Sequence, residues 1–329
     1  MKRIFLLSSE RSGSNLLRTF FDKTNEIDGP YAPQLLKSFL PYITTADILS
    51  SPEKRKRIIH YSLSLITNHP NRWKYIPPIE KFQKFIDESN WEYLDLFDAI
   101  YSDHAKHEGK IGYFIKENNV FDFAGAIEQH LDTTFFIHLV RDPRDVYLSF
   151  SKVPGGPKHP YLGGIHWKDE QERILSLKSR NQIKKLHTVR YEDLIGDTEN
   201  VLRECFKFTE IPFNSEILSQ KREIDKSDSP FLKNISKGIM KHNTNKYKEE
   251  LTKDEVHIVE TAAGRGLIAT FKYKVGCDKK RIITNQEITR FRVVHNIKNI
   301  WSYTKLSFKE FMIRFKRAIV YLQIRRLVS

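Results

Sequence analysis

Cysteine is scarce in this chain, and its scarcity excludes several classes of protein. Only Cys205 and Cys277 occur among 329 residues, which excludes a disulfide framework and argues against a structural zinc site. Long apolar runs are also absent, so no segment is predicted to span a membrane. A strand begins within three residues of the start, which leaves no room for a signal peptide. Together these absences predict a reducing, cytoplasmic setting.

Two further absences concern ligands. The segment with Asp103, His104 and His107 has no further ligand cluster to complement it, so we interpret it as a solvated helix end and predict no metal. The chain contains neither G-x-x-x-x-G-K-[ST] nor G-x-G-x-x-G. An ordinary P-loop NTPase and a dinucleotide enzyme are therefore both poor matches.

The positive charge is concentrated near the C-terminus. The chain has 55 Lys and Arg against 41 Asp and Glu, a net charge of +14. Fifteen of the basic residues but only three acidic ones lie between Lys272 and Ser329. The rest of the chain is close to neutral, which weakens the case for nucleic-acid binding there. We predict a main domain over residues 1–273 and a basic helical extension over 274–329.

The N-terminal segment has the pattern of a strand, a loop and a helix. The apolar run Ile4–Leu7 predicts a strand buried on both faces, and helical spacing resumes near Ser14. The intervening loop contains Gly13, small hydroxyl residues and the cation Arg11. A loop that enters a helix N-terminus presents backbone N–H groups and the positive end of the helix dipole, which together bind anions. An ordinary capped turn is the alternative interpretation.

A second anion site is predicted around Arg141. The strand Phe135–Val140 ends directly before it, and Asp142 and Pro143 are strong N-cap and N1 residues for a following helix. Arg141 is thus placed at the carboxyl end of a strand, where open α/β sheets bind ligands. Ser149 lies two turns along the same helix.

The remaining elements alternate between strands and helices, which predicts an α/β fold with a parallel central sheet flanked by helices. The further strands are Ile111–Ile115 and Leu186–Arg190. The helical segments are Lys54–Asn68, Ile79–Tyr101, Val120–His130, Trp167–Lys184, Thr198–Thr209 and Thr252–Ala263. We interpret the Gly- and Pro-rich segment Val153–Pro160 as a lid, and His138 and Cys205 as core residues.

In this order and spacing, three segments resemble the sulfotransferases that use 3′-phosphoadenosine 5′-phosphosulfate (PAPS). Glu10–Leu17 resembles the family's 5′-phosphosulfate loop, in the variant with Arg in place of Lys. Arg141 with Ser149 resembles the 3′-phosphate site. Arg190–Leu194 resembles the segment whose Tyr, here Tyr191, lies against the adenine. The resemblance spans Met1 to Tyr273 and implies a P-loop-like sulfotransferase fold.

The resemblance also implies which residues bind PAPS as co-substrate, without a metal. Ser236-Lys237-Gly238 resembles a late Arg-Lys-Gly phosphate clamp, with Ser in place of Arg, and Asn15 stands where Thr or Ser is commoner. The implied cofactor-binding residues are Arg11, Ser12, Gly13, Ser14, Asn15, Arg141, Ser149, Tyr191, Lys237 and Gly238.

The catalytic residues implied are Arg11, Lys116 and Glu117. Asn118 occupies the position of the family's catalytic His, so Glu117 is the candidate general base and His159 the second candidate. Lys116 would contact the sulfuryl group, although a surface ion pair explains Lys116 and Glu117 equally well. The acceptor implied is a hydroxyl, or an amine, of a carbohydrate, lipid or small molecule.

Two other classes of function stay open at this level. A nucleotide-dependent kinase or NTPase would use a related fold, but the Lys-Ser/Thr pair and an evident magnesium carboxylate are lacking. A basic nucleic-acid-binding module would explain the pI, but its charge should then line the main domain, so no nucleic acid is expected.

The C-terminal extension has the pattern of a basic amphipathic helix. Between Trp301 and Ile324 an apolar stripe recurs at intervals of three and four residues, with Lys and Arg around it: Phe308, Phe311, Met312, Phe315, Ile319 and Leu322. One hypothesis is peripheral association with the inner surface of an anionic membrane. The alternative is that the stripe docks on the main domain.

Overall fold

The sheet of this protein is parallel throughout. The computed structural model describes residues 1–329 except 44–48, 72, 220–242, 277–280, 305 and 329. Within these ranges five strands form a sheet of order β2-β3-β1-β4-β5, in which every neighbouring pair is parallel. The strands are β1 (Lys2–Ser8), β2 (Ile27–Asp28), β3 (Gly112–Ile115), β4 (Thr134–Val140) and β5 (Leu186–Arg190). The predicted α/β class is confirmed.

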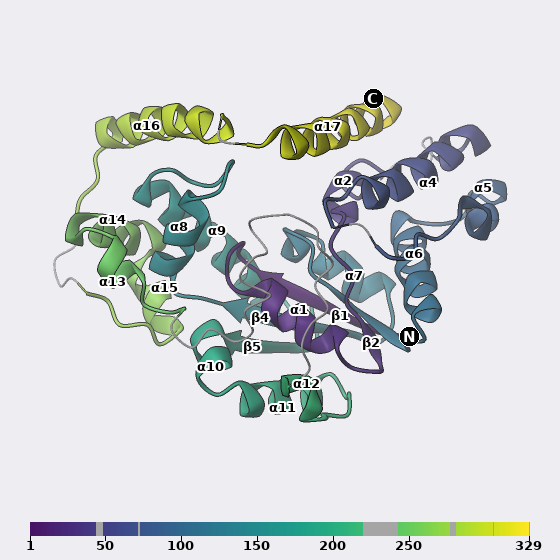
Figure 1. Ribbon diagram of the computed structural model, residues 1–329, viewed down its shortest axis with the longest axis horizontal. Helices are drawn as coiled ribbons and strands as arrows, with labels where there is room; N and C mark the ends of the chain where they lie inside the picture. The colour runs from purple at the N-terminus through teal and green to yellow at the C-terminus, as the bar shows by residue number, and fades with distance from the viewer. Residues whose placement is uncertain (44–48, 72, 220–242, 277–280, 305, 329) are drawn as a thin grey trace.

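Helices cover both faces of the sheet (Figure 1). Phe5 and Leu7 of β1 belong to one buried apolar cluster, whereas Ile4 and Leu6 belong to a second cluster on the opposite face of the sheet. This alternation follows from the two-residue period of a strand, and it explains why β1 is apolar on both faces.

The helices connect the strands in chain order. They are α1 (Ser14–Asp22), α2 (Leu35–Phe39), α4 (Pro52–Thr67), η1 (Ile79–Phe82), α5 (Gln83–Asp87), α6 (Tyr93–His107), η2 (Val120–Asp122), α7 (Ala124–His130), α8 (Pro143–Ser151), α9 (Pro160–Ser179), α10 (Tyr191–Gly196), α11 (Thr198–Phe208), α12 (Glu216–Ser219), α13 (Tyr247–Glu250), α14 (Lys253–Ala263), α15 (Arg265–Thr270), α16 (Asn285–Tyr303) and α17 (Phe308–Val328).

Several predicted boundaries were wrong for local reasons. The helix expected from Trp167 begins at Pro160, because His159 accepts a hydrogen bond from the amide of Tyr161 and Pro160 suits the first helical position. The segment Ile79–Tyr101 is divided into η1, α5 and α6, and a capping box at Glu92 starts α6. The single helix expected over Trp301–Ile324 is also divided, because α16 ends at Tyr303 and α17 begins at Phe308.

The predicted lid is held by the C-terminal extension. The amide of Gly155 donates to Asn299 Oδ1 at 3.1 Å, and the amide of Lys158 donates to His295 Nδ1 at 3.0 Å. Both acceptors belong to α16, so this segment is a docking site for the helical extension. None of the helices in the described ranges is long and apolar enough to cross a membrane.

Candidate active site

The predicted site residues gather at the carboxyl edge of the sheet. From β1 the chain moves to one side for β2 and β3, and then to the other side for β4 and β5. The strand order therefore reverses about β1, and the loops after β1 and β4 border the crevice where open α/β sheets bind ligands.

The loop between β1 and α1 leaves no room for a side chain at Gly13. Gly13 has a φ of +90°, and a Cβ added there would lie 2.3 Å from Cδ2 of Tyr191. Arg11 in the same loop has a φ of 69°, also in the left-handed region. The ring of Tyr191 thus packs directly on the backbone of the loop, and only glycine permits this approach.

Arg141 is fixed where β4 passes into α8. Asp142 caps the helix by accepting from the amide of Arg144 at 2.9 Å, and Pro143 occupies the first helical position, as predicted. The buried indole of Trp167 donates to the carbonyl oxygen of Arg141 at 3.0 Å. The helix cap therefore fixes the backbone that follows Arg141, and the indole fixes the carbonyl group of Arg141 itself.

The guanidinium of Arg141 reaches across to the loop after β1. It donates to the carbonyl of Arg11 at 3.0 Å and to the carbonyl of Asn243 at 2.8 Å. Its carbon lies 4.4 Å from the ring centroid of Tyr191, whose hydroxyl accepts from the Asn243 side chain at 2.7 Å. Arg11 in turn donates through Nε to Ser149 Oγ at 3.1 Å. The two predicted anion sites are thus one connected structure.

The connected site contains buried donors and two nearby guanidiniums, of which Arg141 also pairs with Asp145 at 3.8 Å. Burial lowers the pKa of Arg11, and the charge of Arg141 lowers it further while Glu10 opposes the shift. Within the described part of the chain, the buried Ser12 Oγ and Arg141 Nε have no hydrogen-bond partner. Two nearby guanidiniums with unused buried donors match the requirements of a bound phosphate or sulfate group.

A buried ion network supports the turn that carries Arg141. Arg144 donates to Asp142 and, at 2.6 Å, to Glu260 of α14. Asp145 accepts from the amides of Asn245 and Tyr247 at 2.7 and 3.0 Å. These bonds attach the segment beginning at Asn243 to α8, so they position the carbonyl that Arg141 contacts.

Lys116 lies at the end of β3 beside the same loop. Burial lowers its pKa to about 8; Glu10 opposes this shift, and Arg18, Arg11 and Lys37 add to it. Glu10 also accepts a hydrogen bond from the side chain of Asn118. Lys116 is therefore a cation near a cluster of other cations, where an anionic group would be stabilised.

Glu117 has a different environment from the one expected of a general base. Its two carboxylate oxygens accept from the amides of Leu35 and Leu36 at 2.7 and 2.8 Å, and one also accepts from the hydroxyl of Tyr101 at 3.1 Å. Burial raises its pKa, while these three bonds oppose the shift. The carboxylate holds the first turn of α2, which favours a positioning role for it.

The second candidate base, His159, is also engaged elsewhere. Its Nδ1 accepts from the amide of Tyr161 at 3.2 Å, and its ring stacks on Phe291 of α16 at 3.9 Å. Burial lowers its pKa to about 4, and Lys298 adds to this shift. His159 joins the helix cap to the C-terminal extension.

Sequence reasoning did not assign a role to Glu170 and His166 of α9. Burial raises the pKa of Glu170 to about 7; a hydrogen bond with Ser9 opposes the shift, and the charge of Glu10 adds to it. Its Oε1 lies 3.3 Å from Nε2 of His166, and its buried Oε2 has no hydrogen-bond partner among the described residues. The sequence pattern that could have indicated this pair is a His and a Glu four residues apart on one predicted helix.

The comparison with known families identifies the family of the chain. A model described as the sulfotransferase family matches residues 3–215. The chain belongs to the sulfotransferase family. An uncharacterized protein of Aquifex aeolicus (strain VF5) is 22% identical over 252 residues, which are 74% of this chain and 30% of that relative. The chain therefore spans less than a third of the length of this relative.

Solved sulfotransferase structures share the fold. The sulfotransferase domain from the curacin biosynthetic pathway is 18% identical and superposes with a TM-score of 0.54, over 84% of this chain and 99% of that one. The sulfotransferase domain from the Synechococcus PCC 7002 olefin synthase is 21% identical with a TM-score of 0.53, over 84% and 96% of the two chains.

The sulfotransferase fold brings most of the predicted residues together. Arg11, Ser12, Gly13, Arg141, Ser149 and Tyr191 form the connected structure described above, and Ser14 and Asn15 begin α1 beside it. Lys237 and Gly238 lie outside the described residues. Within the described ranges, no group of three or more His, Cys, Asp or Glu side chains is arranged to hold a metal ion.

Proposed function

We propose that this sulfotransferase transfers the sulfuryl group of PAPS to a hydroxyl, or an amine, of a carbohydrate, lipid or small-molecule acceptor. One observation carries the proposal: Arg11 and Arg141 converge on one loop, where Ser12 Oγ and Arg141 Nε are buried without a hydrogen-bond partner in the described part of the chain. A 5′-phosphosulfate would occupy the loop of Ser12, Gly13 and Ser14, and a 3′-phosphate would lie at Arg141 and Ser149. Tyr191, packed between the two sites, would face the nucleoside.

In the proposed reaction the acceptor oxygen attacks sulfur, and the bond from sulfur to the phosphate oxygen breaks. The acceptor proton passes to a carboxylate, and 3′,5′-ADP leaves. Charge then builds on the bridging oxygen and on the sulfuryl oxygens, where Arg11 and Lys116 would stabilise it electrostatically. These roles match those expected from the sequence.

We assign the general base to Glu170 rather than Glu117. One oxygen of Glu170 has no partner among the described residues and is available to accept a proton, whereas both oxygens of Glu117 already accept backbone bonds. A pKa of about 7 matches proton transfer near neutral pH. His166 is partly exposed and lies beside Glu170, so it would pass the proton on to solvent.

The setting of the reaction is also a proposal. We keep the cytoplasmic location and the association with an anionic membrane as hypotheses from the composition of the chain.

Thermal unfolding with added nucleotides tests the proposed donor. We expect 3′,5′-ADP to raise the unfolding temperature more than ATP does, and a DNA oligonucleotide to have no effect. Losing one charge-assisted contact costs about 1.5–3 kcal/mol, so Arg141→Ala should weaken 3′,5′-ADP binding by about one to two decades in calorimetry.

Arg203→Ala is a matched control, because Arg203 is exposed on α11, where it pairs with its neighbour Glu199 and lies over the ring of Phe213. Unchanged affinity in Arg141→Ala would exclude the 3′-phosphate assignment. Stronger stabilisation by ATP would favour the kinase or NTPase alternative.

A further inference from the structure

Helix α17 docks on the main domain through one face. Val320 is 6% exposed and Ile324 only 1%, and both join the core beside α4. Arg317 donates to the carbonyl oxygens of Leu65 and Pro33 at 3.0 and 2.8 Å. These contacts fix the rotation of the helix about its axis, so they decide which residues face outward.

The opposite face of α17 is apolar and exposed. At about 100° per residue, its exposed apolar residues fall in a narrow stripe on the side opposite Ile324. They are Phe308, Phe311, Phe315, Ile319 and Leu322, between 40% and 79% exposed. These are five of the six residues of the stripe that the sequence predicts, and they face away from the core; the sixth, Met312, is half-buried. The residues that dock are a different set.

Basic residues border this stripe on both sides. By the same helical geometry, Lys309 and Lys316 lie along one edge, and Arg314 and Arg325 lie along the other. All four are exposed. An apolar stripe between two rows of cations is the pattern of a helix that lies in the interface of an anionic membrane.

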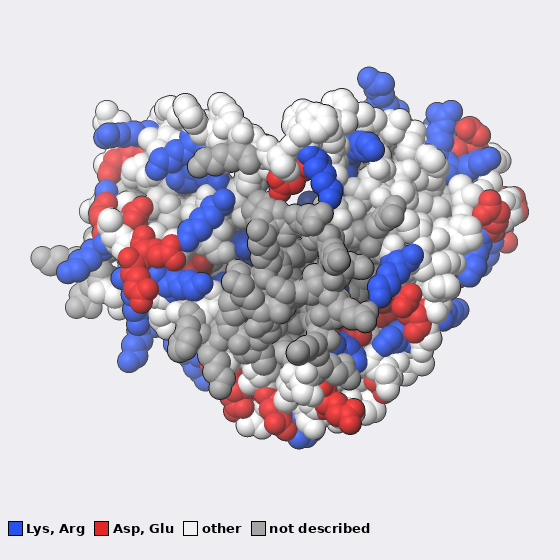
Figure 2. Space-filling model, in the orientation of Figure 1, with Lys and Arg blue, Asp and Glu red and all other residues white. Residues whose placement is uncertain are grey.

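Helix α16 likewise has one face docked on the main domain and an apolar face that is exposed. Its inner face is held by the stack of Phe291 on His159 and by the two bonds from the 155–158 loop described above. Its outer face presents Val293, Ile297, Ile300 and Trp301, between 52% and 69% exposed. Figure 1 shows α16 and α17 end to end along one margin of the molecule, and in Figure 2 this margin is largely white with blue side chains beside it.

We propose that the outer faces of α16 and α17 dock the protein on an anionic membrane. The nine exposed apolar residues named above, here called the α16–α17 face, would enter the boundary between headgroups and acyl chains, and the bordering Lys and Arg would meet the lipid phosphates. The excess of positive charge in this part of the chain disfavours a second copy as the occupant, since like charges would meet. The inference is independent of the sulfuryl donor.

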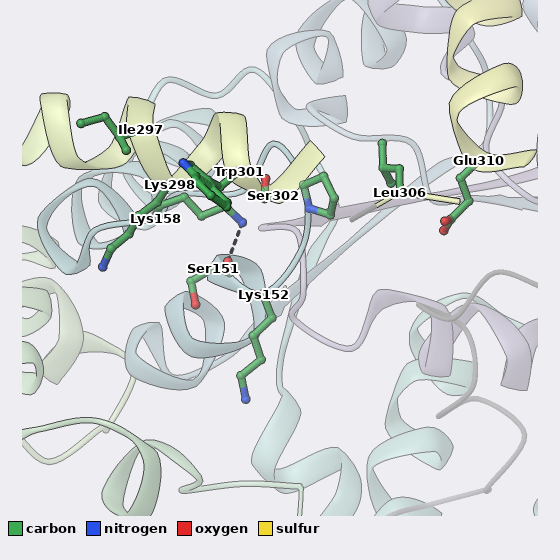
Figure 3. Close-up of a pocket in the computed structure, with 10 residues that line it drawn as sticks. Ser151, Lys152, Lys158, Ile297, Lys298, Trp301, Ser302, Leu306 and Glu310 are labelled. Atoms are coloured by element: carbon green, nitrogen blue, oxygen red, sulfur yellow. Dashed lines mark hydrogen bonds between the residues drawn. The ribbon is translucent and has the colours of Figure 1, made fainter. Parts of the chain in front are cut away.

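A pocket of about 580 Å³ opens beside this face. Figure 3 shows Trp301 and Lys298 of α16 on one side of it, with Ser151 and Lys152 at the end of α8 on the other. Glu310 also lines the pocket and Lys152 pairs with Glu250, so Lys298 beside Trp301 is the cation that would meet a lipid phosphate there.

The fluorescence of one tryptophan can report the contact between the α16–α17 face and a membrane. Of its four tryptophans, Trp73, Trp91 and Trp167 are at most 9% exposed, whereas Trp301 is 68% exposed. We expect the tryptophan emission of the full chain to shift to shorter wavelength with phosphatidylglycerol vesicles and to stay unchanged with phosphatidylcholine vesicles. Trp301→Phe should abolish the shift but retain co-sedimentation.

Two variants of the full chain test the two components separately. Removing apolar contact in Phe311→Ser/Phe315→Ser, or reversing charge in Lys309→Glu/Lys316→Glu, should each weaken vesicle binding about tenfold or more. The matched controls are Ile111→Ser and Lys178→Glu/Lys207→Glu, which change exposed residues away from the α16–α17 face. Circular dichroism of each variant checks that it is folded.

Three results would overturn the proposal. One is that the full chain does not bind anionic vesicles at physiological salt. Another is that binding is equal in the variants and their controls. The third is a dimer in light scattering that Phe311→Ser/Phe315→Ser dissociates, because the face would then be covered by a second copy.

Discussion

Glu117 and Glu170 are both buried carboxylates at the carboxyl edge of the sheet, but their partners differ. Glu117 accepts three hydrogen bonds from α2 and Tyr101, and Glu170 keeps one oxygen without a partner among the described residues. A carboxylate that accepts several backbone bonds stabilises structure, and one with an unused oxygen in a desolvated site is available for proton transfer. The two residues can therefore be separated by experiment.

For Glu170→Gln we expect kcat to fall by about 10²–10⁴ with little change in 3′,5′-ADP affinity, because the amide cannot accept the proton. Burial raises the pKa of this carboxyl to about 7, so kcat of the unmodified enzyme should rise with pH as Glu170 loses its proton. The variant should not show this rise, which forms the acidic limb of the pH profile. The measurement is kcat as a function of pH. Glu172→Gln, which alters an exposed glutamate on the same helix, should keep the normal profile.

Glu117→Gln should act chiefly on stability. Its amide nitrogen cannot accept a bond from a backbone amide, so one buried N–H of Leu35 or Leu36 loses its partner, at a cost of about 1–3 kcal/mol in the free energy of unfolding. Denaturant unfolding measures this loss, and the pH profile of kcat should keep its limb. If the variant is as stable as the unmodified protein but has lost turnover, the general base is Glu117, as predicted from the sequence.

At the scale of elements, the strand–loop–helix unit of β1 and α1 depends on its contact with the start of α10. The ring of Tyr191 occupies the place that any side chain at position 13 would need. The loop and the residue after β5 are therefore a single packed surface, although the sequence separates them widely.

Gly13→Ala tests this contact. The added Cβ forces Tyr191 to move, and overpacking of this kind costs about 1–3 kcal/mol. We expect a lower unfolding temperature and weaker 3′,5′-ADP binding in calorimetry. Gly196→Ala, at the end of α10 where nothing lies within 4 Å of an added Cβ, should change neither.

At the scale of the whole molecule, the C-terminal extension is packed on the domain that carries the candidate active site. Helix α17 contributes Val320 and Ile324 to the core that includes β1, β3 and β4. Helix α16 holds the segment between α8 and α9. The boundary predicted at residue 273 remains a proposal about the chain, and these contacts cross it.

Substitutions of two isoleucines in α17 test this packing. Ile324→Ala removes a side chain that is 1% exposed and should cost about 2–5 kcal/mol in the free energy of unfolding. Ile319→Ala, at 40% exposure on the outer face, should stay within about 0.5 kcal/mol of the unmodified protein. Equal losses in urea unfolding would mean that α17 does not dock as described.

Short-range patterns in the sequence determined much of the fold. The apolar run of β1, the helix start at Ser14, and the cap of Asp142 with Pro143 depend on neighbouring residues, so periodicity and capping rules predicted them correctly. The order of these segments also placed Arg11 and Arg141 at the same edge of the sheet. The two-residue β2 was missed because such a short strand has no period to detect.

Tertiary structure alone decided what each polar side chain does. That Glu117 caps α2, that Glu170 lies beside Ser9, and that the predicted stripe of α17 faces outward all depend on contacts between distant segments. Sequence spacing places a residue on an element and on one face of it. The free energy of its charge or apolar surface is set by the neighbours that folding brings, and those neighbours are not local in the chain.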